Sequence, residues 1–146
     1  MHAPTREPLT RPVQFFTGKG GVGKSTILGA LATAAARAGK RPLIVELGIH
    51  TSSSRLFHGP NAGYEPAEVA PGVCATRVQF EPALVDYITS RLKLRPIANL
   101  VVKNNSLRRL FMAAPGVDEI VTLHRVAQLA AEDRWDPILV DLESTG

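Results

Sequence analysis

The sequence predicts an α/β fold with a parallel sheet, and three observations support this prediction. Residues 13–17, 42–47 and 137–142 are short apolar segments that predict buried strands, and 42–47 lacks polar alternation, which suggests burial on both faces. Between them lie segments with apolar residues at three- and four-residue spacing, which indicates helices. A glycine cluster follows the first strand directly. Strands that alternate with helices along a chain predict a parallel sheet with helices on both faces.

The individual elements follow from the same patterning. We expect strands over 13–17, 42–47, 73–80 and 137–142, and helices over about 24–40, 82–94, 97–112 and 117–132. Abundant alanine favours the first helix, Pro82 suits the first turn of the second, and Asn104 with Asn105 breaks the third. The stretch 48–71, rich in Gly, Ser, Asn and Pro, is expected to be a loop.

The predicted organisation is a lead segment followed by one domain. Residues 1–12 contain three prolines and no apolar segment, which predicts a flexible lead without a secretory signal. Residues 13–146 form the domain, with a helical insert over about 81–134. The chain stops four residues beyond the strand 137–142. We therefore expect a sheet that is incomplete at its C-terminus, as in the N-terminal part of a longer protein.

Composition excludes several classes of protein. Hydrophobic residues make up 45% and charged residues 21%, and no apolar run approaches the roughly 20 residues of a membrane span. The formal charge of +4 is small and its basic residues are scattered, so nucleic acid is not an expected partner. The single cysteine, Cys74, is expected to be buried in a strand. It offers no disulfide or metal cluster and fits the reducing cytoplasm.

A phosphate-binding loop is predicted between the first strand and the first helix. Gly18, Gly23, Lys24 and Ser25 satisfy the pattern G-x-x-x-x-G-K-S/T, with the strand before it and the helix after it that the motif requires. Glycines allow positive φ angles and a close approach of backbone N–H groups to phosphate oxygens. The predicted nucleotide-binding residues are Gly18, Lys19, Gly20, Gly21, Val22, Gly23, Lys24, Ser25 and Thr26.

Four side chains of this loop have predicted roles. The Lys24 ammonium is expected to reach the β- and γ-phosphates of ATP, and Thr26 the α-phosphate. The Ser25 hydroxyl suits Mg²⁺, which prefers oxygen ligands. Lys19 cannot easily fold back onto the nucleotide that its own loop encloses. We expect it to reach a nucleotide across a homodimer interface, as an arginine finger does, with a solvated loop lysine as the alternative.

The segment FFTGKGGVGKST at residues 15–26 resembles the deviant Walker A loop of the MinD/ParA/ArsA class of ATPases, and most of all its anion-transporting, ArsA-like branch. AAPGVDEI at 113–120 resembles the segment before the last helix of that branch's insert. RWDPILVDLESTG at 134–146 resembles its Walker B strand and switch II. The resemblance implies a P-loop NTPase fold and Mg²⁺-dependent ATP hydrolysis in a nucleotide-gated homodimer that acts on a partner.

The resemblance also implies roles for particular residues. Lys19 matches the signature lysine and Lys24 the phosphate-loop lysine, while Ser25 matches the magnesium ligand. Asp141 matches the Walker B aspartate, which holds Mg²⁺ through water. Independently of the resemblance, Asp141 ends a predicted strand, and ligands bind outside the carboxyl ends of parallel strands.

The chain departs from the branch after the second strand. Gly48 stands where the branch has the aspartate that orients the attacking water. The nearest acid, Glu46, could be a displaced catalytic acid, a magnesium-shell group or a structural group. His50 is expected to be a solvated loop histidine, whereas Thr145 and Gly146 match switch II, which senses the γ-phosphate in the family.

The partner and the reaction stay open from the sequence. Arsenite binding in the branch uses several cysteines, so the single cysteine argues against an arsenite site. Apolar residues of the insert suit either a protein client or packing within the domain: Leu107, Leu110, Phe111, Met112, Val117 and Ile120. The leading hypothesis is ATP hydrolysis coupled to dimer-based movement on a partner. The alternatives are a non-hydrolysing or ParA/MinD-like binding and positioning protein, and an inert truncated chain.

Overall fold

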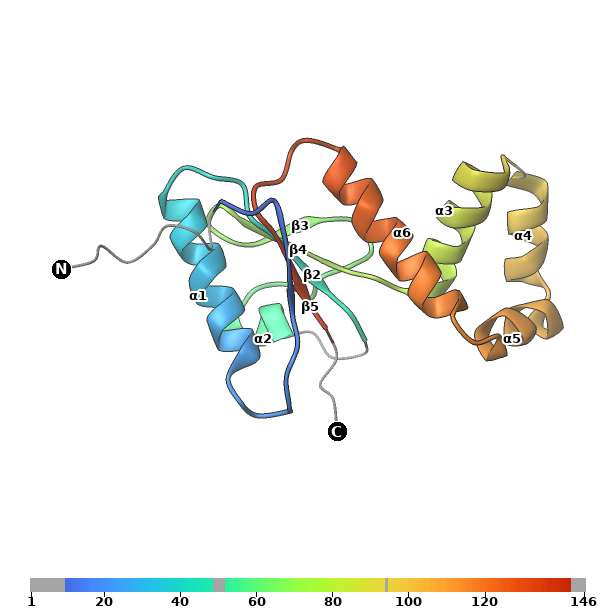
Figure 1. Ribbon diagram of the computed structural model, residues 1–146, viewed down its shortest axis with the longest axis horizontal. Coiled ribbons are helices and arrows are strands. Elements are labelled where there is room, and N and C mark those ends of the chain that lie inside the picture. The colour runs from blue at the N-terminus through green and yellow to red at the C-terminus, as the bar shows by residue number, and fades with distance from the viewer. Residues whose placement is uncertain (1–9, 49–51, 94, 143–146) are drawn as a thin grey trace. The chain divides into compact units, whose positions relative to one another are not determined.

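The computed structural model describes residues 10–48, 52–93 and 95–142. The chain forms two compact units (Figure 1). The first, which we call the sheet unit, contains the described parts of Met1–Arg77 and Ala130–Gly146. The second, the helical unit, is Val78–Leu129.

The sheet unit contains a five-stranded sheet in the order β1-β5-β2-β4-β3. The strands are β1 Val13–Phe16, β2 Leu43–Glu46, β3 Ala67–Ala70, β4 Val73–Arg77 and β5 Ile138–Asp141. All neighbouring pairs are parallel except β3 with β4, which is antiparallel. This arrangement, flanked by helices, confirms the predicted α/β fold with a parallel sheet, apart from the antiparallel strand β3, which was not predicted.

The strand register brings four side chains into one row at the carboxyl ends of the parallel strands. Phe16 pairs with Asp141, Asp141 with Glu46, and Glu46 with Arg77. Paired residues on neighbouring strands project to the same face of a sheet. Glu46 and Asp141 therefore lie side by side, although they are far apart in the sequence.

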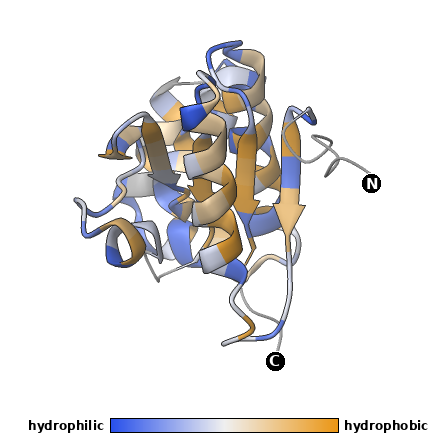
Figure 2. Cartoon of the chain, turned by 90° about the vertical axis from the view of Figure 1, so that its left-hand side faces the viewer, coloured by the Kyte–Doolittle hydropathy of each residue, from blue (hydrophilic) through white to orange (hydrophobic). Residues whose placement is uncertain are grey.

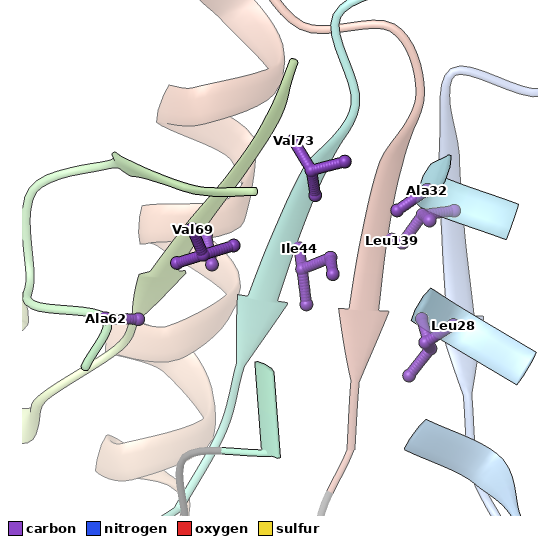
Figure 3. Packing of buried hydrophobic residues seen from close by; sticks show 8 residues of the cluster. Leu28, Ala32, Ile44, Ala62, Val69, Val73 and Leu139 are labelled. Atoms are coloured by element: carbon purple, nitrogen blue, oxygen red, sulfur yellow. The ribbon is translucent and has the colours of Figure 1, made fainter. Parts of the chain in front are cut away.

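One face of the sheet is covered by α1 (Lys24–Arg37) and α2 (Ser52–Phe57). Leu28 and Ala32 of α1 pack toward Ile44 of β2 and Leu139 of β5, and all four side chains are buried (Figure 3). Full burial of one leucine stabilises a fold by roughly 1.5–3 kcal/mol. Figure 2 shows the apolar colour of the strands against which α1 lies. All residues of β2 and β5 are buried, as their apolar sequences predict. The predicted burial of the first strand is wrong, because β1 lies at the end of the strand order and is only partly buried, with Phe15 51% exposed.

The expected loop over 48–71 is wrong in two places. Its serine-rich start forms α2, and Ala67–Ala70 forms β3, which pairs with β4 across a turn. Gly72 supplies the positive φ of +74° in that turn, and its N–H donates to Glu68 Oε1 at 2.8 Å. Both elements are short and contain polar residues, so partners elsewhere in the fold stabilise them rather than their own patterning.

Smaller differences concern β4. This strand ends at Arg77 rather than at residue 80, because α3 begins at Phe80. Cys74 on β4 is half-buried, not fully buried as expected. Partial burial raises the pKa of its thiol, and the nearby Glu68 carboxylate adds to this shift. The thiolate, which is the reactive form, is therefore disfavoured.

The helical unit contains α3 (Phe80–Leu92), α4 (Arg95–Lys103), α5 (Asn105–Ala113) and most of α6 (Val117–Ala131). The predicted break at Asn104 is confirmed, because its Oδ1 accepts hydrogen bonds from Ser106 N (3.0 Å) and Leu107 N (3.1 Å) and caps α5. None of the helices in the described part of the chain combines the length and hydrophobicity needed to cross a bilayer.

Polar contacts join α3 to the later helices of this unit. Glu81 pairs with Arg108 of α5, and Asp86 lies 3.8 Å from the Arg125 guanidinium of α6. His124 of α6 packs edge-on against Tyr87, with ring centroids 5.2 Å apart, and its Nε2 lies 2.8 Å from Ser90 Oγ. The Tyr87, Ser90 and His124 contacts fasten α3 to α6.

Candidate nucleotide-binding site

The loop between β1 and α1 is exposed and has backbone angles that favour glycine. Gly21 and Gly23 have φ angles of +81° and +85°, which other L-residues rarely adopt, and residues 19–23 are exposed. Gly23 caps α1 without a side chain, and the first turn of the helix carries no acidic residue. The first N–H groups of α1 are therefore open to an anion, which the helix dipole also favours.

Lys24, the first residue of α1, reaches the end of β5. Its ammonium donates to Asp141 Oδ1 and to the Leu142 carbonyl. The side chains of Lys24 and Asp141 are only 12% and 8% exposed, so this ion pair is poorly screened by water. The structure thus brings together the predicted phosphate-loop lysine and the predicted Walker B aspartate.

Ser25 lies on the other side of the same carboxylate. Its Oγ is 3.3 Å from Asp141 Oδ2, so a hydroxyl and a carboxylate oxygen stand close enough to share one cation. Both are hard oxygen donors, the type that Mg²⁺ requires, and phosphate and water oxygens can complete its octahedral shell. The residues present therefore fit a magnesium ion held at Ser25 and Asp141.

Glu46, at the end of β2, is 1% exposed and belongs to the same site. Its Oε1 accepts from the Ser53 N–H at 2.6 Å and from the Ser52 hydroxyl at 2.9 Å, both at the start of α2. Ser52 Oγ also lies 3.0 Å from Asp141 Oδ2. Glu46 Oε2 is buried and has no hydrogen-bond partner among the described residues.

The other predicted residues are placed differently. Lys19 and Thr26 are exposed. Gly48, where the expected aspartate would stand, has a positive φ of +94°. His50, Thr145 and Gly146 lie outside the described residues.

Sequence reasoning missed Ser52 and Ser53. A serine run follows a strand that ends in a carboxylate, and this was the available signal. Their composition predicted a loop, and only the fold brings Ser52 to Asp141, 89 positions later in the chain. The Leu142 carbonyl, as a backbone group, had no sequence signal.

Glycines at a helix entrance, followed by a lysine and a hydroxyl that meet an aspartate at the end of the neighbouring parallel strand, define a P-loop nucleoside triphosphatase. Within that class, the chain belongs to the anion-transporting ATPase family, whose model matches residues 11–146. The family is one of ATPases, so ATP is the nucleotide that membership implies. The resemblance inferred from the loop is confirmed.

Three relatives illustrate the family. The chain is 29% identical to ATPase BagA of Mycobacterium tuberculosis, over 92% of the chain and 43% of that protein. It is 31% identical to a putative arsenical pump-driving ATPase of Halobacterium salinarum, over 90% of the chain and 22% of that protein. It is 27% identical to ATPase ASNA1 homolog 1 of Paramecium tetraurelia, over 90% of the chain and 40% of that protein. The chain spans less than half the length of each of these relatives.

Proposed function

We propose that the chain binds ATP with Mg²⁺ at residues 18–26 and that the protein hydrolyses it within an ATPase domain over residues 13–146. The observation that carries this proposal is the meeting of Lys24 and Ser25, at the start of α1, with Asp141, at the end of β5. A lysine, a hydroxyl and a carboxylate are thereby gathered beside an exposed glycine loop. ATP hydrolysis requires mainly positioning and charge compensation, which these groups supply.

Lys24 is the group that changes partner when the nucleotide binds. Its ammonium now bonds the Asp141 carboxylate and a carbonyl. A triphosphate placed against the loop amides offers several anionic oxygens to the same ammonium, and Asp141 with Ser25 is then available to hold the metal. Mg²⁺, when bound, neutralises charge on the β- and γ-phosphate oxygens.

Glu46 is the candidate carboxylate that orients the attacking water. In hydrolysis a water oxygen bonds to the γ-phosphorus and gives up a proton to a nearby acceptor, while the bond from that phosphorus to the bridging oxygen breaks and ADP and inorganic phosphate leave. Glu46 Oε1 is occupied by α2, whereas the buried Oε2 has no partner among the described residues and can accept a hydrogen bond from a water that enters the site with the nucleotide. We propose that Glu46 orients the attacking water, the role for which position 48, a glycine, has no carboxylate.

Lys19 is proposed to act in a homodimer. The side chain is exposed on the outer part of the loop. An ammonium there adds charge to a neighbouring subunit's triphosphate, and loss of the γ-phosphate would then loosen the dimer. Hydrolysis in this arrangement produces movement rather than a small-molecule product.

The output of that movement is proposed to be work on a protein client, in the cytoplasm. Some large apolar side chains of the last three helices are at least 45% exposed, and four of these lie within α4 and α5: Ile97, Leu100, Leu110 and Met112. Of the residues singled out from the sequence, Leu107, Phe111 and Val117 are half-buried, so they favour packing. Methionine and leucine surfaces suit varied apolar partners.

A second candidate function is nucleotide-dependent binding without hydrolysis, as in a positioning protein. Gly48 in place of an acid favours it, and so does the commitment of Glu46 Oε1 to the start of α2. ATP turnover by the wild-type protein separates the two functions, and the variant Glu46→Gln tests the role of Glu46. Unchanged ATP turnover in this variant would remove Glu46 from the chemistry, whereas ATP binding without turnover in the wild type would favour the second function.

The test of the proposal combines calorimetric titration with ATP and a phosphate-release assay on the complete natural protein. Lys24→Ala is expected to abolish ATP binding, and retained affinity would refute the loop assignment. Lys19→Ala is expected to bind ATP but to lose turnover and ATP-dependent dimerisation. Lys103→Ala, which removes an exposed lysine at the end of α4, controls for the loss of one positive charge.

A further inference from the structure

The Ser52 hydroxyl stands between the two carboxylates of the site. Its Oγ lies 2.9 Å from Glu46 Oε1 and 3.0 Å from Asp141 Oδ2. Glu46 and Asp141 are 1% and 6% exposed and are paired across the neighbouring strands β2 and β5. Neither the family match nor the loop motif assigns a role to this serine.

A hydroxyl carries one proton, so Ser52 can donate fully to only one carboxylate at a time. Glu46 Oε1 and Asp141 Oδ2 therefore compete for the same hydrogen. The two carboxylates have different further partners. Glu46 Oε1 already accepts a hydrogen bond from the Ser53 N–H at 2.6 Å. Asp141 is also bonded by Lys24 and Ser25. A change at Asp141 consequently alters the hydrogen bonding of Glu46.

We propose that Ser52 is a positioning residue that couples metal binding at Asp141 to the orientation of Glu46. This inference rests on the proposed function. When Asp141 Oδ2 is engaged at the metal position, the Ser52 proton serves Glu46 Oε1 alone. Both hydrogen bonds to Oε1 then fix the carboxylate, and Oε2, which has no partner among the described residues, is held as the acceptor for water.

The same contacts connect the site to α2. Ser52 and Ser53 are the first residues of this helix, and both bond Glu46 Oε1. The start of α2 is therefore linked to the carboxylate to which the Ser52 hydroxyl donates its hydrogen bond. Loss of the Ser52 hydroxyl should loosen the coupling between metal and carboxylate while it leaves the glycine loop intact.

The test measures ADP affinity by calorimetry in the complete natural protein, once with Mg²⁺ and once with EDTA. In Ser52→Ala we expect the affinity in EDTA to stay within twofold of the wild type. The gain in affinity on adding Mg²⁺ should fall about tenfold, the size of loss typical when a group behind a metal ligand is removed. Ser52→Thr, which keeps the hydroxyl, should retain the gain, and Ser106→Ala, an exposed serine of α5, serves as the control.

Turnover in a double-variant cycle supplies the second measurement. If Ser52 acts through Glu46, then Ser52→Ala should not lower turnover further in a Glu46→Gln background. An additive loss would overturn the inference, as would an unchanged Mg²⁺ gain in Ser52→Ala or an equal loss in Ser52→Thr. Should Ser52→Ala fail to fold by circular dichroism, Ser52→Cys, with its weaker hydrogen bonds, replaces it. Wild-type protein that binds no ADP would instead refute the proposed function.

Discussion

The ion pair between Lys24 and Asp141 joins the start of α1 to the end of β5. Burial of two charges is costly, and removing one partner leaves the other charge uncompensated. In this site the loss would be compounded, because Glu46 lies on the neighbouring strand and repels the Asp141 carboxylate. Lys24 therefore stabilises the fold in the absence of a nucleotide.

Exchange of Lys24 for an isosteric apolar residue tests this stabilising role. Lys24→Met is expected to lower the free energy of unfolding by about 3 kcal/mol without nucleotide, because Asp141 becomes a buried unpaired charge. Urea unfolding followed by circular dichroism measures the change. The double variant Lys24→Met with Asp141→Asn should recover part of the stability but not ATP binding. If the double variant is no more stable than Lys24→Met, the unpaired Asp141 charge is not the cause of the lost stability.

Individual site residues were predictable to the extent that local chemistry defines them. Lys24 and Ser25 follow from the loop motif, and Asp141 from its place at a strand end. Glu46 was found as the nearest acid, but its choice of partner was open, and its chemical role remains a proposal. Ser52 could not be found, because a serine acquires this role only when two carboxylates meet around it.

The approach of α2 to β3 depends on a glycine. A Cβ at Gly59 would lie 2.3 Å from the Val69 carbonyl oxygen of β3, and a backbone atom cannot move aside easily. At Gly63, in the same connection, an added Cβ would meet nothing within 4 Å. Gly59 thus allows the connection after α2 to lie directly on the sheet edge.

We expect Gly59→Ala to destabilise the protein by about 2 kcal/mol, since overpacking forces backbone shifts. Gly63→Ala should be neutral or stabilising by up to about 1 kcal/mol, because it only restricts the unfolded chain. Thermal unfolding of both variants gives the comparison. Equal stabilities would show that α2 and β3 are not packed through Gly59.

Among the helices and strands, apolar patterns were predictable and the more polar segments were not. The helix at α1 and the strands β2 and β5 were predicted, because each buries an apolar surface that its own residues define. By contrast, α2 depends on its hydrogen bonds to Glu46 of β2, and β3 depends on its pairing with β4. Neither element could be predicted from its own residues, because the stabilising contacts come from other strands.

The two units differ in what stabilises them, and one histidine makes the helical unit sensitive to pH. His124 meets Ser90 and Tyr87 of α3. Partial burial lowers the pKa of His124, Arg91 lowers it further, and Asp86 opposes the shift. Protonated His124 is therefore disfavoured in the folded helical unit.

The sign of the resulting pH dependence follows from the lowered pKa. As pH falls below about 6.5, the unfolded histidine gains a proton before the folded one does, so acid favours unfolding. We expect hydrogen exchange in α3 and α6 to be slower at pH 7.5 than at pH 5.5 after correction for intrinsic rates. His124→Gln should remove the difference, while His58→Gln, in the sheet unit, should keep it. Persistence of the difference in His124→Gln would exclude this histidine as its source.

The sequence by itself determined the α/β class, the phosphate-loop motif and the family, because these depend on residue types at fixed local spacing. Only the tertiary structure decided that Glu46, Asp141 and Ser52 form one cluster and that a supposed loop contains α2 and β3. The physical reason is that hydrogen bonds and ion pairs at this site join residues 6 to 118 positions apart. No local pattern encodes such contacts, and they exist only once the parallel strands bring their carboxyl ends together.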